Sequence, residues 1–156
     1  MPSPEPQIRA LSDPRVARIT HYFTHYNEPL LHELMQAPED RSGITYSLYS
    51  DVTSPDHTLK LVDPALATLP PWDGGLRWYR VRNRRLAGPM FWQQGTLRLA
   101  WARGHDVLIV TGSYYCLTNW LLAPLARLRR KRLIWWTIGQ VVGEPSRLQR
   151  WMKRRF

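Results

Sequence analysis

The chain has 156 residues, and it carries a formal charge of +10 at pH 7. Its hydrophobic content of 44% and its 8 Trp exclude an intrinsically disordered polypeptide. The single cysteine, Cys116, excludes an internal disulfide and a cysteine-based zinc site. Such cysteine usage suits a reducing compartment, so we expect a cytoplasmic protein. Residues 1–14 have no charged segment followed by an apolar core, and we expect a flexible leader there rather than a secretory signal.

The first half of the chain predicts three strands and one helix. Residues 15–23 are rich in β-branched and aromatic residues, which indicates a strand. Residues 29–36 place leucine and methionine four positions apart, which indicates a helix with one apolar stripe. Residues 44–50 predict a second strand, and the prolines of residues 51–75 predict a loop. Residues 76–82 predict a third strand near a sheet edge, since arginines occupy one of its faces.

The second half predicts alternating helices and buried strands. Residues 89–103 have apolar side chains at helical spacing, and Gly104 is expected to end that helix. Residues 106–111 and 131–138 are apolar runs typical of strands covered on both faces, and residues 114–130 predict a largely buried helix with a kink or break at Pro124. The last residues, 144–156, predict an amphipathic helix with an apolar stripe formed by Leu148, Trp151, Met152 and Phe156.

This alternation of strands and helices predicts an α/β fold with a Rossmann-like parallel sheet flanked by helices, in one domain over residues 15–156. Residues 107–126 carry no charge and are long enough to span a bilayer. However, the turn signal at Gly112 and Ser113 and the proline at Pro124 interrupt them. We therefore expect a strand, a turn and a helix here rather than a membrane span.

The order of four motifs resembles a known family. The chain has PLLHEL at 29–34, DVLIVTG at 106–112, NWLLA at 119–123 and ARLRRKRLIWWTIG at 126–139. In this order they resemble the N-terminal domain of glycosyltransferase family 4, over about residues 15–156. The resemblance implies one half of a GT-B fold, in which the N-terminal domain holds the acceptor of a retaining sugar transfer.

The resemblance also implies partners outside this chain. A C-terminal domain, absent from this sequence, would bind a nucleotide-sugar donor such as a UDP- or GDP-sugar, with no metal and no tightly bound cofactor. The acceptor would be a glycan or a lipid-linked sugar. By itself, the domain is expected not to transfer sugar.

Three loops are the candidate binding sites, because ligands of open α/β sheets bind outside the carboxyl ends of the strands. The candidate residues are His25, Tyr26, Asn27 and Glu28; Gly112, Ser113 and Tyr114; and Gly139 and Gln140. Each loop has a plainer interpretation: Asn27 or Glu28 can cap the following helix, Ser113 can cap another, and the third can be an ordinary turn. Ile138 stands where many related domains have a histidine, so no catalytic base is named.

The remaining chemistry-bearing residues predict no metal site. The other histidines, which are His21, His32, His57 and His105, form no ligand cluster and are expected to be structural or exposed. The tryptophans are expected in the core or as cover between the sheet and the helices. The exception is Trp151, which with Phe156 suits either an interfacial helix or the absent second domain.

Positive charge collects at the C-terminal end. Residues 127–156 contain ten Lys or Arg against one acid, Glu144. Such a block is attracted to anions, which favours peripheral contact with an anionic membrane, although a solvated face or the rim of the absent domain also explains it. The alternative function is a basic nucleic-acid-binding module, but no known nucleic-acid motif is present.

Overall fold

A computed structural model describes residues 14–36, 43–54, 58, 60–68 and 76–136. Its main sheet has five strands in the order β3-β2-β1-β6-β7, and every pairing in it is parallel. The bounds of these strands are β1 (Arg15–Tyr22), β2 (Thr45–Asp51), β3 (Trp78–Arg80), β6 (Val107–Thr111) and β7 (Arg132–Trp136). The predicted α/β fold with a Rossmann-like parallel sheet is thereby confirmed.

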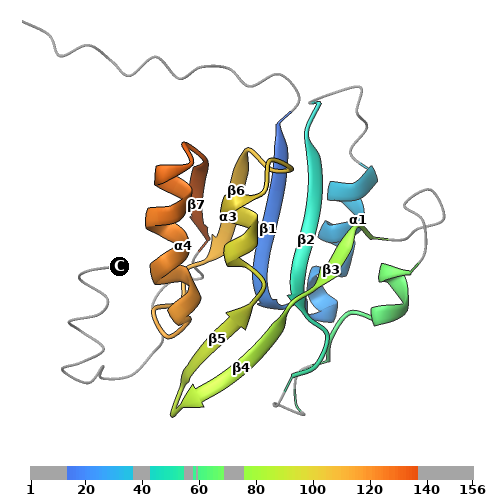
Figure 1. Cartoon of the computed structure of the whole chain (residues 1–156). Coiled ribbons are helices and arrows are strands. Elements are labelled where there is room, and N and C mark those ends of the chain that lie inside the picture. The colour runs from blue at the N-terminus through green and yellow to red at the C-terminus, as the bar shows by residue number, and fades with distance from the viewer. Residues whose placement is uncertain (1–13, 37–42, 55–57, 59, 69–75, 137–156) are drawn as a thin grey trace, which may run out of the picture.

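Helices lie on both faces of this sheet (Figure 1). The helices are α1 (Glu28–Gln36), α3 (Leu97–Trp101) and α4 (Leu117–Leu128), with short 3-10 helices η1 (His25–Asn27) and η2 (Pro64–Ala67). On one face, Ile19 and Val110 of the sheet pack with Leu122 of α4. On the other, Leu48 of β2 packs with Leu31 of α1. In β2, Leu48 faces this second core and its neighbour Tyr49 faces the first, as the two-residue period of a strand requires.

Most predicted elements match the observed ones. The strands predicted at 15–23, 44–50 and 106–111 correspond to β1, β2 and β6, and the helix at 29–36 corresponds to α1. The predicted third strand contains β3, which lies at the sheet edge as expected. The uncharged residues 107–126 contain β6 and most of α4, which agrees with the strand, turn and helix expected there. Among the described residues, no helix has both the length and the apolarity needed to cross a bilayer.

The helix predicted at 89–103 is wrong over its first half. Residues Arg82–Ala87 and Met90–Gln94 form an antiparallel hairpin, β4 and β5, and only Leu97–Trp101 is helical. Two glycines with positive φ explain the difference: Gly88 at 53° turns the hairpin, and Gly95 at 96° separates β5 from α3. Glycine adopts such backbone angles at the lowest cost, and the positive φ of Gly95 interrupts the predicted helix, since an α-helix needs negative φ.

Two further predictions need correction. Of the kink or break predicted at Pro124, the break does not occur, because α4 continues from Leu117 to Leu128. β7 is not buried on both faces: Leu133 and Trp135 pack beside α4, whereas Ile134 and Trp136 on the other face are 47% and 53% exposed. Burial alternates along β7 because β7 is an edge strand. An apolar run in the sequence does not reveal that a strand lies at the edge.

Candidate functional site at the carboxyl edge

The parallel strands all end on the same side of the sheet. We call the row of their carboxyl ends the carboxyl edge, which is distinct from the edge strands β3 and β7. From β1 the chain passes through α1 to β2 on one side, whereas from β6 it passes through α4 to β7 on the other. The strand order therefore reverses between β1 and β6, which lie side by side with Ile19 opposite Val110. This is a topological switch point, where ligands of open α/β sheets bind.

The loop after β1 presents two exposed rings at this edge. The backbone N–H of His25 donates to Lys60 O at 3.0 Å, and His25 Nδ1 lies 3.1 Å from the same oxygen. Tyr26 is 67% exposed and lies next to the His25 ring. These contacts fix the backbone of η1 while leaving the Tyr26 ring open to solvent.

Asn27 and Glu28 make local contacts within the loop. Asn27 Nδ2 donates to Thr24 Oγ1 at 2.8 Å, which closes the turn into α1. Glu28 is the first residue of α1, and its carboxylate lies 3.8 Å from His32 Nε2. A carboxylate in the first turn of a helix is favourable because the helix dipole is positive there. These two residues therefore shape the loop, and His25 and Tyr26 offer its accessible groups.

The loop after β6 is tied to its surroundings by backbone hydrogen bonds. Gly112 N–H donates to Trp136 O at 2.7 Å, and Cys116 N–H donates to Ser113 O at 3.1 Å. Ser113 is buried and does not cap α4, because that helix begins at Leu117 with Cys116 as its N-cap residue. The capping prediction for Ser113 is therefore wrong: the chain makes one more turn before the helix starts.

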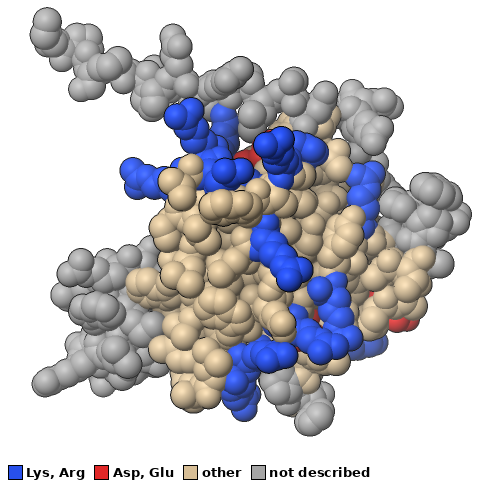
Figure 2. Space-filling model, in the orientation of Figure 1, with Lys and Arg blue, Asp and Glu red and all other residues tan. Residues whose placement is uncertain are grey.

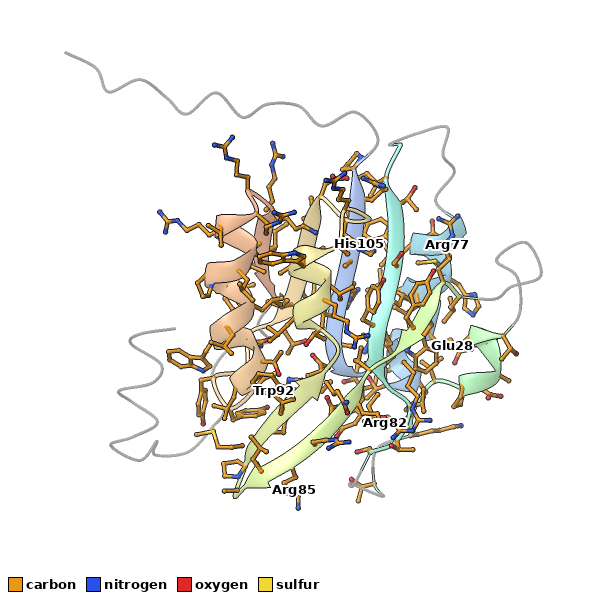
Figure 3. The ribbon with its side chains drawn as sticks, viewed as in Figure 1. Glu28, Arg77, Arg82, Arg85, Trp92 and His105 are labelled. Atoms are coloured by element: carbon orange, nitrogen blue, oxygen red, sulfur yellow. The ribbon has the colours of Figure 1, made fainter. Side chains whose placement is uncertain are left out.

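The unpredicted hairpin crosses the carboxyl edge (Figure 1). Gln93 Nε2 donates to Thr20 O of β1 at 2.8 Å, and Asn83 N–H donates to Asp51 Oδ2 at the end of β2 at 2.7 Å. Phe91 N–H donates to Tyr115 O at 3.1 Å, next to α4. The hairpin is thus bonded to both sides of the switch point and covers part of it. Arg82, Arg85 and Trp92 lie along this hairpin in Figure 3.

His21 lies under this hairpin at the end of β1. Its ring meets the ring of Phe91 edge to face, with centroids 4.6 Å apart, and lies 5.8 Å from that of Tyr115. Burial lowers the pKa of His21 to about 4, so the imidazole is neutral at neutral pH. Within the described part of the chain, its buried Nε2 has no hydrogen-bond partner. Buried polar atoms are seldom left unpaired, and a ligand would reach this nitrogen only if the hairpin moved.

The sequence assigned His21 a structural or surface role, and the hairpin explains why. The residues that bury it, Phe91 and Tyr115, lie about 70 and 90 positions further along the chain. A signal was nevertheless available, since His21 is one of the last residues of a strand that flanks the switch point.

The predicted candidates thus fall into two groups. The structure places His25, Tyr26, Asn27 and Glu28 after β1, and Gly112, Ser113 and Tyr114 after the adjacent strand β6. Phe91 and Tyr115 lie with His21 between the two loops and enlarge the predicted set. Gly139 and Gln140 lie outside the described residues, as do Trp151 and Phe156. No group of three potential metal ligands occurs in the described ranges.

The class of protein that these features define is an α/β domain with a Rossmann-like sheet and a candidate ligand site at its switch point. Comparison of the chain with protein-family models, with curated proteins and with solved structures gives no match in any of the three.

Proposed function

We propose that this domain is the acceptor-side half of a glycosyltransferase, and that it holds a sugar or lipid-linked acceptor at the carboxyl edge. The observation that carries the proposal is the reversal of strand order between β1 and β6, with a candidate loop directly after each of the two strands. In an open α/β sheet, this arrangement forms a crevice flanked by loops of adjacent strands.

The side chains at this edge suit a sugar. Tyr26 offers an exposed ring, and aromatic rings with a few placed polar groups are typical of ligand sites. His25 and Tyr114 add groups that can exchange hydrogen bonds with hydroxyls. By resemblance to family 4, a second domain would bring the nucleotide-sugar to this edge. In complete enzymes of this kind, positive charge in the cleft between the two domains stabilises the departing nucleoside diphosphate while the acceptor hydroxyl attacks the anomeric carbon.

The first test measures acceptor binding by the isolated chain. The 15N-labelled protein is titrated with a panel of neutral saccharides and, separately, with UDP- and GDP-sugars. We expect saccharides to shift the amide signals of residues 24–28 and 112–115, and nucleotide-sugars to have a much smaller effect. The variant Tyr26→Ala should weaken saccharide binding, whereas Leu128→Ala, at an exposed position of α4 near the other edge, should not.

The second test measures transfer. The complete gene product is incubated with radiolabelled UDP- and GDP-sugars and a membrane lipid extract, and label in the lipid and glycan fractions is counted. Transfer that falls in the Tyr26→Ala variant supports the proposal. Absence of transfer, together with absence of saccharide binding by the isolated chain, would rule it out.

A further inference from the structure

A basic cleft lies opposite the carboxyl edge, at the amino ends of the strands, where β6 and β7 begin. It has a volume of about 480 Å³, within the usual range of sites for small ligands. The end of α3, the start of β6 and the turn from α4 to β7 contribute its walls. Its cationic and aromatic lining consists of Trp101, Arg103, Arg129, Arg130, Lys131 and Arg132. Figure 2 shows Lys and Arg side chains gathered at this upper end of the molecule.

The lining of the basic cleft includes an acidic residue, but this residue does not neutralise the arginines of the cleft. Asp106 is the one carboxylate among its lining residues, and Arg15 pairs with it. The Arg15 backbone N–H donates to Asp106 Oδ2 at 3.0 Å, and Arg15 Nε lies 3.4 Å from the same atom. The backbone hydrogen bond from Arg15 lowers the pKa of Asp106, so the carboxylate stays ionised.

Lys131 has a structural part in this arrangement. Its Nζ donates to Leu99 O at 2.7 Å and to Ala102 O, which are carbonyls at the end of α3. An ammonium group at the carboxyl end of a helix satisfies groups that have no partner within the helix. Lys131 therefore holds α3 against the turn after α4, which leaves Arg129 and Arg130 as the groups considered for a ligand.

Arg129 is held in place by an aromatic ring. Its guanidinium carbon lies 4.8 Å from the centroid of the Trp101 ring. Trp101 is 56% exposed, which corrects the expectation that this tryptophan belongs to the core. Stacking of arginine on an aromatic face restricts its motion and leaves the edge of the guanidinium free to donate hydrogen bonds.

Arg130 occupies a position where glycine is usual. Its φ is 54°, in the left-handed region. Arg130 N–H donates to Arg127 O at 3.0 Å and Lys131 N–H donates to Ala126 O at 2.9 Å, which is the Schellman pattern of a helix end. A side chain at this position costs about 1 kcal/mol relative to glycine. An outlier of this kind beside a cleft points to a role for the side chain that glycine cannot provide.

We infer that this basic cleft binds the phosphate group of a small molecule or of a lipid headgroup. The planar guanidinium of arginine donates two parallel hydrogen bonds to phosphate oxygens, so Arg129 and Arg130 are suited to hold such a group. His105, labelled in Figure 3, also lines the cleft, and its buried Nδ1 has no hydrogen-bond partner among the described residues. This site is separate from the carboxyl edge, so it does not depend on the proposed function.

The test compares two charge-matched double variants of the full chain. Arg129→Gln with Arg130→Gly removes two charges from the basic cleft, and Arg82→Gln with Arg84→Gln removes two from the exposed strand β4. Binding of inorganic phosphate is measured by calorimetry at low ionic strength. We expect roughly tenfold weaker binding in the cleft variant and a change within about twofold in the β4 variant. In the wild-type chain, phosphate should shift the Trp101 indole N–H signal.

A second arm identifies the source of the phosphate. Sedimentation with phosphatidylcholine vesicles is compared with sedimentation with vesicles that contain about one-fifth phosphatidic acid. Cleft-dependent binding to the acidic vesicles assigns the site to a lipid headgroup, and phosphate binding without vesicle binding assigns it to a soluble phosphate compound. Failure of both probes, or equal losses in the two double variants, would overturn the inference. A third result would also overturn it: an RNA oligonucleotide that binds the chain more tightly than phosphate or vesicles do, and whose affinity falls equally in the cleft variant and in the β4 variant.

Discussion

The two edges of the sheet differ in access, although exposed arginines lie at both (Figure 2). At the carboxyl edge, the hairpin bonds to the strand ends, and polar side chains such as Asp51 and Gln93 are buried and satisfied there. At the other edge, the basic cleft is open and its arginines project from a helix end. The comparison teaches that topology predicts where a crevice forms, whereas the insertions and charges around it determine which ligand can enter. We propose a sugar acceptor at the first edge and a phosphate group at the second.

Asp51 provides the strongest test of how the carboxyl edge is closed. Its Oδ1 accepts from Val52 N at 2.8 Å and from Thr53, and its Oδ2 accepts from Asn83 N. Asp51→Ala leaves these donors unpaired, so we expect a loss of about 3–5 kcal/mol in the free energy of unfolding. Urea unfolding followed by tryptophan fluorescence measures it.

The control for this prediction is another aspartate that accepts a backbone N–H. Asp63 is exposed and accepts from Ala65 N at 2.8 Å, where it caps η2. Asp63→Ala should cost only about 1 kcal/mol. Equal losses in the two variants would show that Asp51 does not anchor the hairpin.

His21 makes the stability of the carboxyl edge dependent on pH. Burial lowers its pKa from 6.5 to about 4, so the unfolded chain takes up the proton first as the pH falls. Neutral His21 makes its full contribution to the free energy of unfolding above pH 6.5. Between pH 6.5 and about pH 4 the free energy of unfolding falls by about 1.4 kcal/mol per pH unit. The free energy of unfolding is measured against pH for the wild type and for His21→Phe. The difference between the two curves gives this slope, because the contributions of the other titrating groups cancel. Parallel stability curves would mean that the imidazole is not buried.

Thr118 tests the contact between the hairpin and α4. It is fully buried, and its Oγ1 accepts from Gln93 N–H at 2.7 Å. Thr118→Val keeps the shape but removes the acceptor, so we expect a loss of about 1–3 kcal/mol. The same substitution at exposed Thr68, whose hydroxyl donates to Ala65 O, should cost under about 0.5 kcal/mol. Thermal unfolding of both variants distinguishes these effects, and a Thr118→Val variant as stable as wild type would contradict this account of the hairpin.

How much of this fold the sequence predicts depends on whether a pattern is local. The β-branched runs in β1 and β6 and the apolar stripe of α1 result from one face of one element, so they are visible in the sequence. The hairpin was missed because Met90, Leu97 and Trp101 have helical spacing by coincidence. The turn at Gly88 and the break at Gly95 were the stronger signals, since backbone angle overrides side-chain periodicity.

The candidate sites show the same limit. The loops at His25 and Gly112 were predictable, because both follow strands that end at one edge. The environment of His21 was not, since it is built by residues far along the chain. For the basic cleft, the sequence gives the charge excess of residues 127–132. It does not show that Trp101 lies beside Arg129, which follows from the packing of α3 on α4.

Arg130→Gly has the smallest expected effect on the free energy of unfolding, and it is expected to stabilise the protein where the other substitutions destabilise it. Because its φ is 54°, Arg130→Gly should raise the free energy of unfolding by about 0.5–1 kcal/mol. The same substitution at Arg127, inside α4, should lower it by about 1 kcal/mol, since glycine is unfavourable within a helix. Urea unfolding measures both. If Arg130→Gly also weakens phosphate binding, stability and binding change in opposite directions at one residue, as expected where a strained side chain is retained for a ligand. A destabilised Arg130→Gly variant would show that the arginine supports the helix end itself.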